Sequence, residues 1–367
     1  MLVLSLSLYG AYLHYLHLTE AQNALIAQHN TKAAAAYGGN LANHAANAQF
    51  FAVISYAITA SVLFAGFIDM VVLRLLGMFR LGAIVRVTYY EALLQPFTLI
   101  VLGIGLGAII ICAFVPFNTF GEDTKLYRDV AMSFVLMFAL VPMVFATGKV
   151  VDEEIENRTM LTLMSKPIAR WQVIVGKYLG VVCLVLLLMT VMTLCASAGA
   201  YLRYFDDKRV DFQVAASAKE TMALFWSNDK GLLALWPAMA LEFMEVCTLA
   251  AISMAIATRF AMALNMTAIV LLYIGANMTR FVPLLHLGNP WQPLANAGSY
   301  VLPFLSNFDL NQALIYRQFT VGSEYIKGAP SYGQIWGYVG FASLYGLLYI
   351  GIGLSLAIAM FRTRELT

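Results

Sequence analysis

Charge is scarce in this sequence. Only 11% of the 367 residues are Asp, Glu, Lys or Arg, and 61% are hydrophobic; a soluble domain is about a quarter charged and about half apolar. The surplus of apolar surface needs a solvent other than water, so the composition excludes an ordinary soluble domain and indicates an integral membrane protein. Basic residues form no run outside short clusters beside apolar segments, which gives no support to nucleic-acid binding.

Patterns for catalysis and metal binding are lacking too. No Ser/His/Asp or paired-carboxylate arrangement is visible. Gly148-Lys149 and Gly176-Lys177 lack the upstream Gly and the following Ser or Thr of a phosphate-binding loop. His14 and His17 have no third ligand nearby, so no metal is predicted. We therefore predict no catalytic residue, no cofactor and no metal in this chain.

Cysteines are few and unpatterned. The four of them, Cys112, Cys183, Cys195 and Cys247, lie in or beside apolar runs without CxxC spacing, as expected of small packing residues. Residues 1–18 lack a basic start and a small-residue cleavage site, which favours a retained helix over a signal peptide.

What the sequence does contain is long apolar runs. Several reach the roughly 20 residues that cross about 30 Å of hydrocarbon as a helix, and no alternating strand pattern is present. The predicted fold class is therefore all-α, a polytopic helical membrane protein. The predicted runs are 2–18, 50–73, 96–116, 130–148, 178–201, 232–257, 262–285 and 334–361. Residues 286–333, rich in Pro and Gly, predict a re-entrant or interfacial element.

Charge is concentrated in one stretch, "DEEIENRTMLTLMSKPIARWQVIVGK", residues 152–177. Acids open it and bases follow, an order that complements a helix dipole, and Glu154 and Arg158 form a favourable i,i+4 pair. Met160, Leu163 and Met164 share one helical face, and Pro167 would end the helix. The pattern predicts a short amphipathic helix that starts at Asp152 and is followed by a second, shorter helix from Arg170; a solvated loop is the alternative.

The distribution of arginines predicts the orientation of the chain. With alternating spans, the insert 149–177 falls on the same side as the arginines of the other short connections, which are Arg74, Arg80, Arg86, Arg259, Arg362 and Arg364. The positive-inside rule places this side in the cytoplasm.

Two further groups of residues are candidate sites within the apolar runs. Glu242 and Glu245 lie either on a short interfacial helix before the span proper or at a buried polar site, since acids at bilayer depth are costly and usually functional. Gly103 and Gly107 have GxxxG spacing, which permits close helix packing.

The charged insert resembles the first cytoplasmic loop of type-2 ABC transporter permeases. The matching residues are Glu154, Arg158, Thr159, Leu163, Lys166, Pro167, Arg170, Gly176 and Lys177. "GEDTKLYRD" (121–129), "LPFLSNFDL" (302–310) and "FRTREL" (361–366) also look like that family. The resemblance covers about 80–367, and it implies that the nine matching residues form an ATPase-coupling loop, 149–177.

The resemblance implies an architecture, a function and partners. Residues 79–367 would be a six-span permease domain, and residues 1–78 an accessory membrane hairpin. The chain would be the membrane subunit of an ATP-driven exporter in a bacterial-type cytoplasmic (inner) membrane. Its partners would be cytoplasmic ABC ATPase subunits, a second copy or a homologous permease, and membrane lipid. ATP hydrolysis would take place in the partner.

Two other functions fit the sequence. One is a membrane scaffold, or an accessory subunit of a larger complex, that recruits an ATPase without transporting. The other is an ion-coupled transporter, which needs charges working in relay within the membrane; Glu242 and Glu245 alone give it little support.

Overall fold

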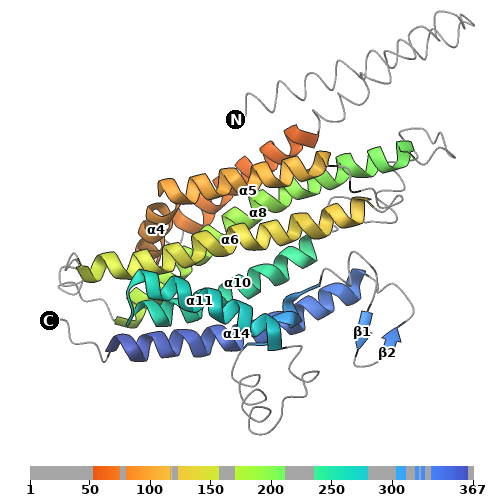
Figure 1. Cartoon of the computed structure of the whole chain (residues 1–367). Coiled ribbons are helices and arrows are strands. Elements are labelled where there is room, and N and C mark those ends of the chain that lie inside the picture. The colour runs from red at the N-terminus through yellow and green to blue at the C-terminus, as the bar shows by residue number, and fades with distance from the viewer. Residues whose placement is uncertain are drawn as a thin grey trace, which may run out of the picture.

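The protein is a bundle of long helices (Figure 1). The structure, a computed structural model, describes residues 53–74, 80–115, 117, 123–156, 170–210, 235–279, 303–310, 319–321, 324–326 and 332–362. Six helices in these ranges are long and apolar enough to cross a membrane, namely Val53–Met70, Pro96–Phe114, Asp123–Lys149, Trp171–Tyr204, Trp236–Ala257 and Gly333–Phe361. The prediction of an all-helical, polytopic membrane protein is confirmed.

The elements follow one another along the chain with few interruptions. The first described span merges into a π-helical segment, η1 (Ile68–Leu73). The helices that follow are α4 (Arg80–Leu93), α5 (Pro96–Phe114), α6 (Asp123–Glu156), α8 (Arg170–Val210), α10 (Trp236–Ala257), α11 (Met262–Met278) and α14 (Tyr332–Arg362). Pro96 opens α5 after an extended Gln95, which suits a residue without a backbone N–H.

Between α11 and α14 the described elements are short. They are a 3-10 turn, η4 (Leu305–Phe308), and an antiparallel pair of strands, β1 (Phe319–Val321) and β2 (Glu324–Ile326). The predicted run 262–285 begins where α11 begins, but α11 has 17 residues, at the lower limit for a spanning helix. The predicted run 2–18 lies outside the described residues.

The bundle has two ends, the loop end and the far end. At the loop end, α6 ends, α8 begins, the turn 258–261 joins α10 to α11, and α14 ends (Figure 1). At the far end, α5 ends and α6, α10 and α14 begin. The two stems of the charged insert, Arg259 and Arg362 therefore share one end, as the alternation of spans predicts.

Helices α6 and α8 are much longer than the spans predicted for them. They have 34 and 41 residues, or about 50 and 60 Å at 1.5 Å per residue, so both project beyond a hydrocarbon layer of about 30 Å. The prediction of a separate helix starting at Asp152 is wrong, because Asp152–Glu156 form the last turns of α6. The segment from Arg170 is likewise continuous with α8. No Gly or Pro lies between Lys149 and Glu156 to stop the helix.

Helix α10 lies at the centre of the bundle. It contacts α6, α8, α11 and α14, and most of its residues are buried. Its packing on α14 is close: a Cβ added at Gly353 would lie 3.1 Å from the backbone carbonyl carbon of Ala251. The outward faces of α5, α11 and α14 carry exposed Ile, Leu, Val and Phe side chains, such as Ile104, Leu271 and Phe341. Such faces are suited to contact with lipid.

Candidate functional site at the loop end

The structure describes the two stems of the predicted coupling loop. Glu154 lies in the last turn of α6 and Arg170 begins α8, so residues 157–169 join two helices that pack against each other. Gly176 and Lys177 lie in the first turns of α8, where Lys177 is buried. The other matching residues, Arg158, Thr159, Leu163, Lys166 and Pro167, lie outside the described residues.

Gly176 brings α4 and α8 into close contact. A Cβ added there would lie 3.0 Å from Cβ of Ile84, and one added at Gly180 would lie 2.7 Å from Cβ of Thr88. The two glycines are four residues apart, the spacing that lets helix backbones approach in membranes. Gly176, predicted as a coupling residue, is thus a helix-packing residue in this structure.

The GxxxG pair predicted from the sequence, Gly103 and Gly107, does not pack against a described helix. A Cβ added at Gly103 or Gly107 would meet no described atom within 4 Å, whereas one at Gly105 would lie 2.7 Å from the Met192 methyl group. Helix α5 therefore packs on α8 through Gly105. A contact of Gly103 and Gly107 with another chain remains a prediction.

Helix α4 is also tied to the span before it. The Tyr90 hydroxyl donates a hydrogen bond to Asp69 of η1, and the guanidinium carbon of Arg86 lies 5.8 Å from the centre of the Tyr90 ring. The hydrogen bond to Asp69 raises the pKa of Tyr90, so the phenol remains a donor. Ile68 beside Asp69 is 2% exposed and belongs to the main core. The segment 53–74 is thus joined to the rest of the bundle.

A buried polar network ties three helices together just inside the loop end. The Oγ1 of Thr147 on α6 lies 2.6 Å from the Oγ of Ser253 on α10, and the Nδ2 of Asn265 on α11 donates to the same Ser253 oxygen over 3.0 Å. The Thr147 hydroxyl also lies 3.0 Å from the carbonyl of Met143. All three side chains are fully buried. Where lipid replaces water, polar contacts of this kind hold helices together.

Sequence reasoning missed these three residues. Each is a single polar side chain within an apolar run, and such residues are common enough to carry no pattern of their own. The available signal was that each lies within about two turns of the predicted loop end. A second contact was equally invisible in the sequence, since Tyr178 on α8 donates to the backbone carbonyl of Cys247 on α10 over 3.1 Å.

Glu242 and Glu245 lie inside the bundle. They are 5% and 4% exposed on an unbroken α10, so the structure does not form a separate interfacial helix there. Asp309 lies close enough to Glu245 for their charges to interact. The segment around Asp309 is held on α14 because Tyr338 donates to the carbonyl of Asn307 over 2.7 Å. A functional role for the two glutamates remains a prediction.

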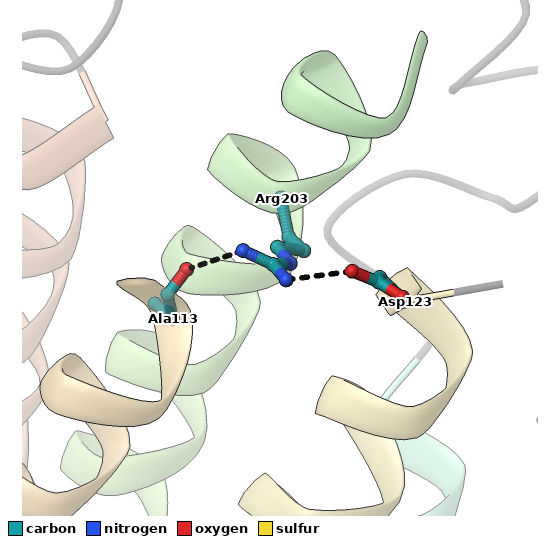
Figure 2. A network of polar contacts seen from close by, with 3 residues as sticks. All are labelled: Ala113, Asp123 and Arg203. Carbon is teal, nitrogen blue, oxygen red and sulfur yellow. Dashed lines mark hydrogen bonds and ion pairs between the residues drawn. The ribbon is translucent and has the colours of Figure 1, made fainter. Parts of the chain in front are cut away.

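At the far end, an ion pair joins α6 and α8 (Figure 2). The Nη2 of Arg203 on α8 lies 2.8 Å from Oδ2 of Asp123 at the start of α6, and Nη1 donates to the carbonyl of Ala113 at the end of α5 over 3.5 Å. Behind this pair, a side chain at Gly199 would overlap the buried Tyr127 hydroxyl. Three helices are therefore fixed to one another at the far end.

Neither a metal nor redox chemistry is indicated by the described residues. They contain no group of three His, Cys, Asp or Glu side chains that could hold a metal ion. The four cysteines are free thiols that are buried or partly buried.

Comparison with known proteins assigns the chain to a family. Residues 2–366 match the family described as "ABC-2 family transporter protein". The chain belongs to the ABC-2 transporter family. Members of this permease family are non-catalytic membrane subunits, and they generally pair with ATPase subunits. A comparison with curated proteins finds no match.

The family match extends beyond the resemblance seen in the sequence. It begins at residue 2, so it covers nearly all of the segment 1–78 that the sequence predicts to be an addition to the permease. The buried Ile68 and the Asp69–Tyr90 hydrogen bond agree with a continuous permease body. The division at residue 78 remains a prediction.

Proposed function

We propose that this ABC-2 permease is the membrane half of an ATP-driven exporter and that the loop 149–177 docks a cytoplasmic ATPase. The observation that supports this most is the geometry of the two stems that the loop joins. These stems, α6 and α8, extend well past a membrane core and pack against each other. A force applied to residues 157–169 therefore acts on two helices that reach deep into the bundle.

Charge supports the cytoplasmic placement of this end. Arg170, Arg259 and Arg362 belong to elements that meet at the loop end. Short connections rich in arginine remain on the cytoplasmic side of a membrane. We place the protein in a bacterial-type cytoplasmic membrane with the loop facing the cytoplasm, where an ATPase has access to it.

The partners follow from the same geometry. ATPase subunits shift the permease only if they bind its two conformations with different affinity, and the loop is the contact through which we expect this difference to act. A second permease copy, or a homologous permease, would complete the transport path. The open face of α5 at Gly103 and Gly107 is one surface where such a partner fits, while the apolar faces of α11 and α14 remain in lipid.

The test is co-purification of the chain with its ATPase, followed by ATP hydrolysis in lipid nanodiscs. The wild-type chain should bind the ATPase and change its hydrolysis rate. A variant in which residues 157–169 are replaced by a Gly/Ser linker of equal length should insert normally and bind no ATPase. Binding and hydrolysis unchanged by the linker would contradict the proposal. Binding through the loop with no effect on hydrolysis, and no transport in vesicles, would favour a scaffold that only recruits the ATPase.

A further inference from the structure

We propose that α10 is the helix on which both stems of the coupling loop converge, and that Thr147, Ser253 and Tyr178 are the positioning residues that deliver loop movement to it. This inference rests on the proposed function. It assigns to named side chains the step between ATPase docking and the rearrangement of the permease.

The first stem is α6. Thr147 lies nine residues before the helix ends at Glu156, and its hydroxyl lies 2.6 Å from that of Ser253 on α10. Asn265 of α11 donates to the Ser253 oxygen over 3.0 Å, so the network also holds the next helix. Beside it, Gly148 leaves room for α11, since an added Cβ would lie 3.0 Å from Met262 Cγ. The inner part of α6 is therefore fastened to both α10 and α11.

The second stem is α8. Tyr178 lies eight residues after the helix begins at Arg170, and its hydroxyl donates to the carbonyl of Cys247 on α10 over 3.1 Å. The two stems thus make polar contacts with the same helix. Because these contacts are buried and tie each stem to α10, we expect displacement of a stem to be passed on to α10.

The rest of the molecule shows what α10 would move. It carries the buried Glu242 and Glu245 nearer the far end, and it packs closely on α14 through Ala251 and Gly353. Helix α6 contains Pro142, five residues before Thr147. A proline removes one backbone hydrogen bond, so α6 can bend at Pro142. The segment of α6 nearer the far end would stay fixed by the Arg203–Asp123 pair.

The test uses the full-length chain with its ATPase in nanodiscs. Thr147→Val and Ser253→Ala remove the α6 contact, Tyr178→Phe removes the α8 contact, and Thr147→Ser retains the hydroxyl. Ser197→Ala is the matched control, because Ser197 is buried and, among the described residues, bonds only to the carbonyl of Leu194 in its own helix. The readouts are ATPase affinity and the change in hydrolysis rate caused by the permease.

All variants should bind the ATPase like the wild type, since none lies in the loop. Thr147→Val, Ser253→Ala and Tyr178→Phe should each lower the hydrolysis response about threefold, the factor of a typical hydrogen bond between membrane helices. Combining Thr147→Val with Tyr178→Phe should lower it about tenfold. Thr147→Ser and Ser197→Ala should respond like the wild type.

A disulfide that links two helices covalently tests the same inference. Oxidation of a Gly148→Cys/Met262→Cys variant would join α6 to α11, and the response should survive because the two helices move together. A response lost on oxidation and regained on reduction would overturn the inference, as would full responses in Thr147→Val and Tyr178→Phe. A wild-type chain that leaves hydrolysis unchanged would contradict the proposed function itself, and the inference with it.

Discussion

Arg203 and Asp123 form an ion pair of 2.8 Å between the far ends of α8 and α6, with side chains 8% and 15% exposed. The guanidinium also lies over the face of Phe117, with its carbon 5.7 Å from the ring centre, and it donates to the carbonyl of Ala113 near the end of α5. A cation at the carboxyl end of one helix and an anion at the amino end of another both complement the helix dipoles. The pair therefore fixes α6 and α8 to each other at the far end.

Breaking this pair should destabilise the protein more than removing it. Arg203→Met or Asp123→Leu leaves a charge without its partner, and each should cost about 3 kcal/mol, the lower end for a buried pair because Asp123 is partly exposed. The double variant should be more stable than either single one. Thermal unfolding in detergent measures all three. A double variant that is no more stable than the single ones, or whose loss of stability is the sum of theirs, would show that the pair does not couple these helices.

Gly180 and Gly107, each from a pair of glycines four residues apart, should respond differently to substitution by alanine. Gly180→Ala puts a methyl group 2.7 Å from Thr88 Cβ and 3.0 Å from the Val85 carbonyl oxygen, so overpacking should cost about 1–3 kcal/mol. Gly107→Ala meets nothing among the described residues, and the stability of the monomer should not fall. Thermal unfolding compares the two. A lower yield of permease dimer in Gly107→Ala alone would indicate that its face contacts a second chain.

The orientation makes a prediction about labelling in intact cells. Lys166 and Arg170 belong to the loop and should be cytoplasmic, whereas Asp207 and Lys208 near the end of α8 should face outward. Single cysteines at 166 and 208, in a background without the native cysteines, would be treated with a membrane-impermeant reagent. Position 208 should label and position 166 should not. The reverse pattern would overturn the orientation and the docking of an ATPase at the loop.

Sequence alone could predict the spans but not their true ends. The apolar run of 178–201 was visible because hydropathy marks it, yet α8 continues through Asp206, Asp207, Lys208 and Arg209, since charged residues are compatible with a helix outside the membrane. In the same way, Pro167 suggested an elbow, but nothing in the sequence marked Glu156 as the end of α6. Charge indicated where apolar spans end and gave no information about where helices end.

Packing partners were also beyond the reach of the sequence. Gly103 and Gly107 have the same spacing as Gly176 and Gly180, and within the part of the chain that the structure describes only the second pair has a helix against it. Spacing reports which glycines share a face, whereas the neighbour depends on tertiary arrangement. The Thr147–Ser253 contact joins residues 106 apart in sequence and had no local signature.

The corrected end of α6 changes what Glu154→Lys should do. A lysine near the carboxyl end of a helix complements the dipole by about 0.3–1 kcal/mol, so α6 should be at least as stable as in the wild type. If Glu154 contacts the ATPase, reversal of its charge should weaken binding without loss of the folded permease. Unfolding temperature and ATPase affinity are measured together. Weaker binding accompanied by a lower unfolding temperature would trace the effect to the helix instead of the contact.

The most direct test of the account is the affinity of the ATPase for Leu163→Ala. If Leu163 is a central apolar anchor of the loop, truncation should cost about 1–3 kcal/mol, or roughly five- to 150-fold in Kd. Leu271→Ala is the matched control, because Leu271 lies near the middle of α11, away from the loop end, with 63% of its surface exposed. We expect weak binding and an uncoupled hydrolysis rate for Leu163→Ala, with wild-type behaviour for Leu271→Ala. Full binding and full coupling in Leu163→Ala, Glu154→Lys and the linker variant alike would contradict the claim that this loop receives the ATPase.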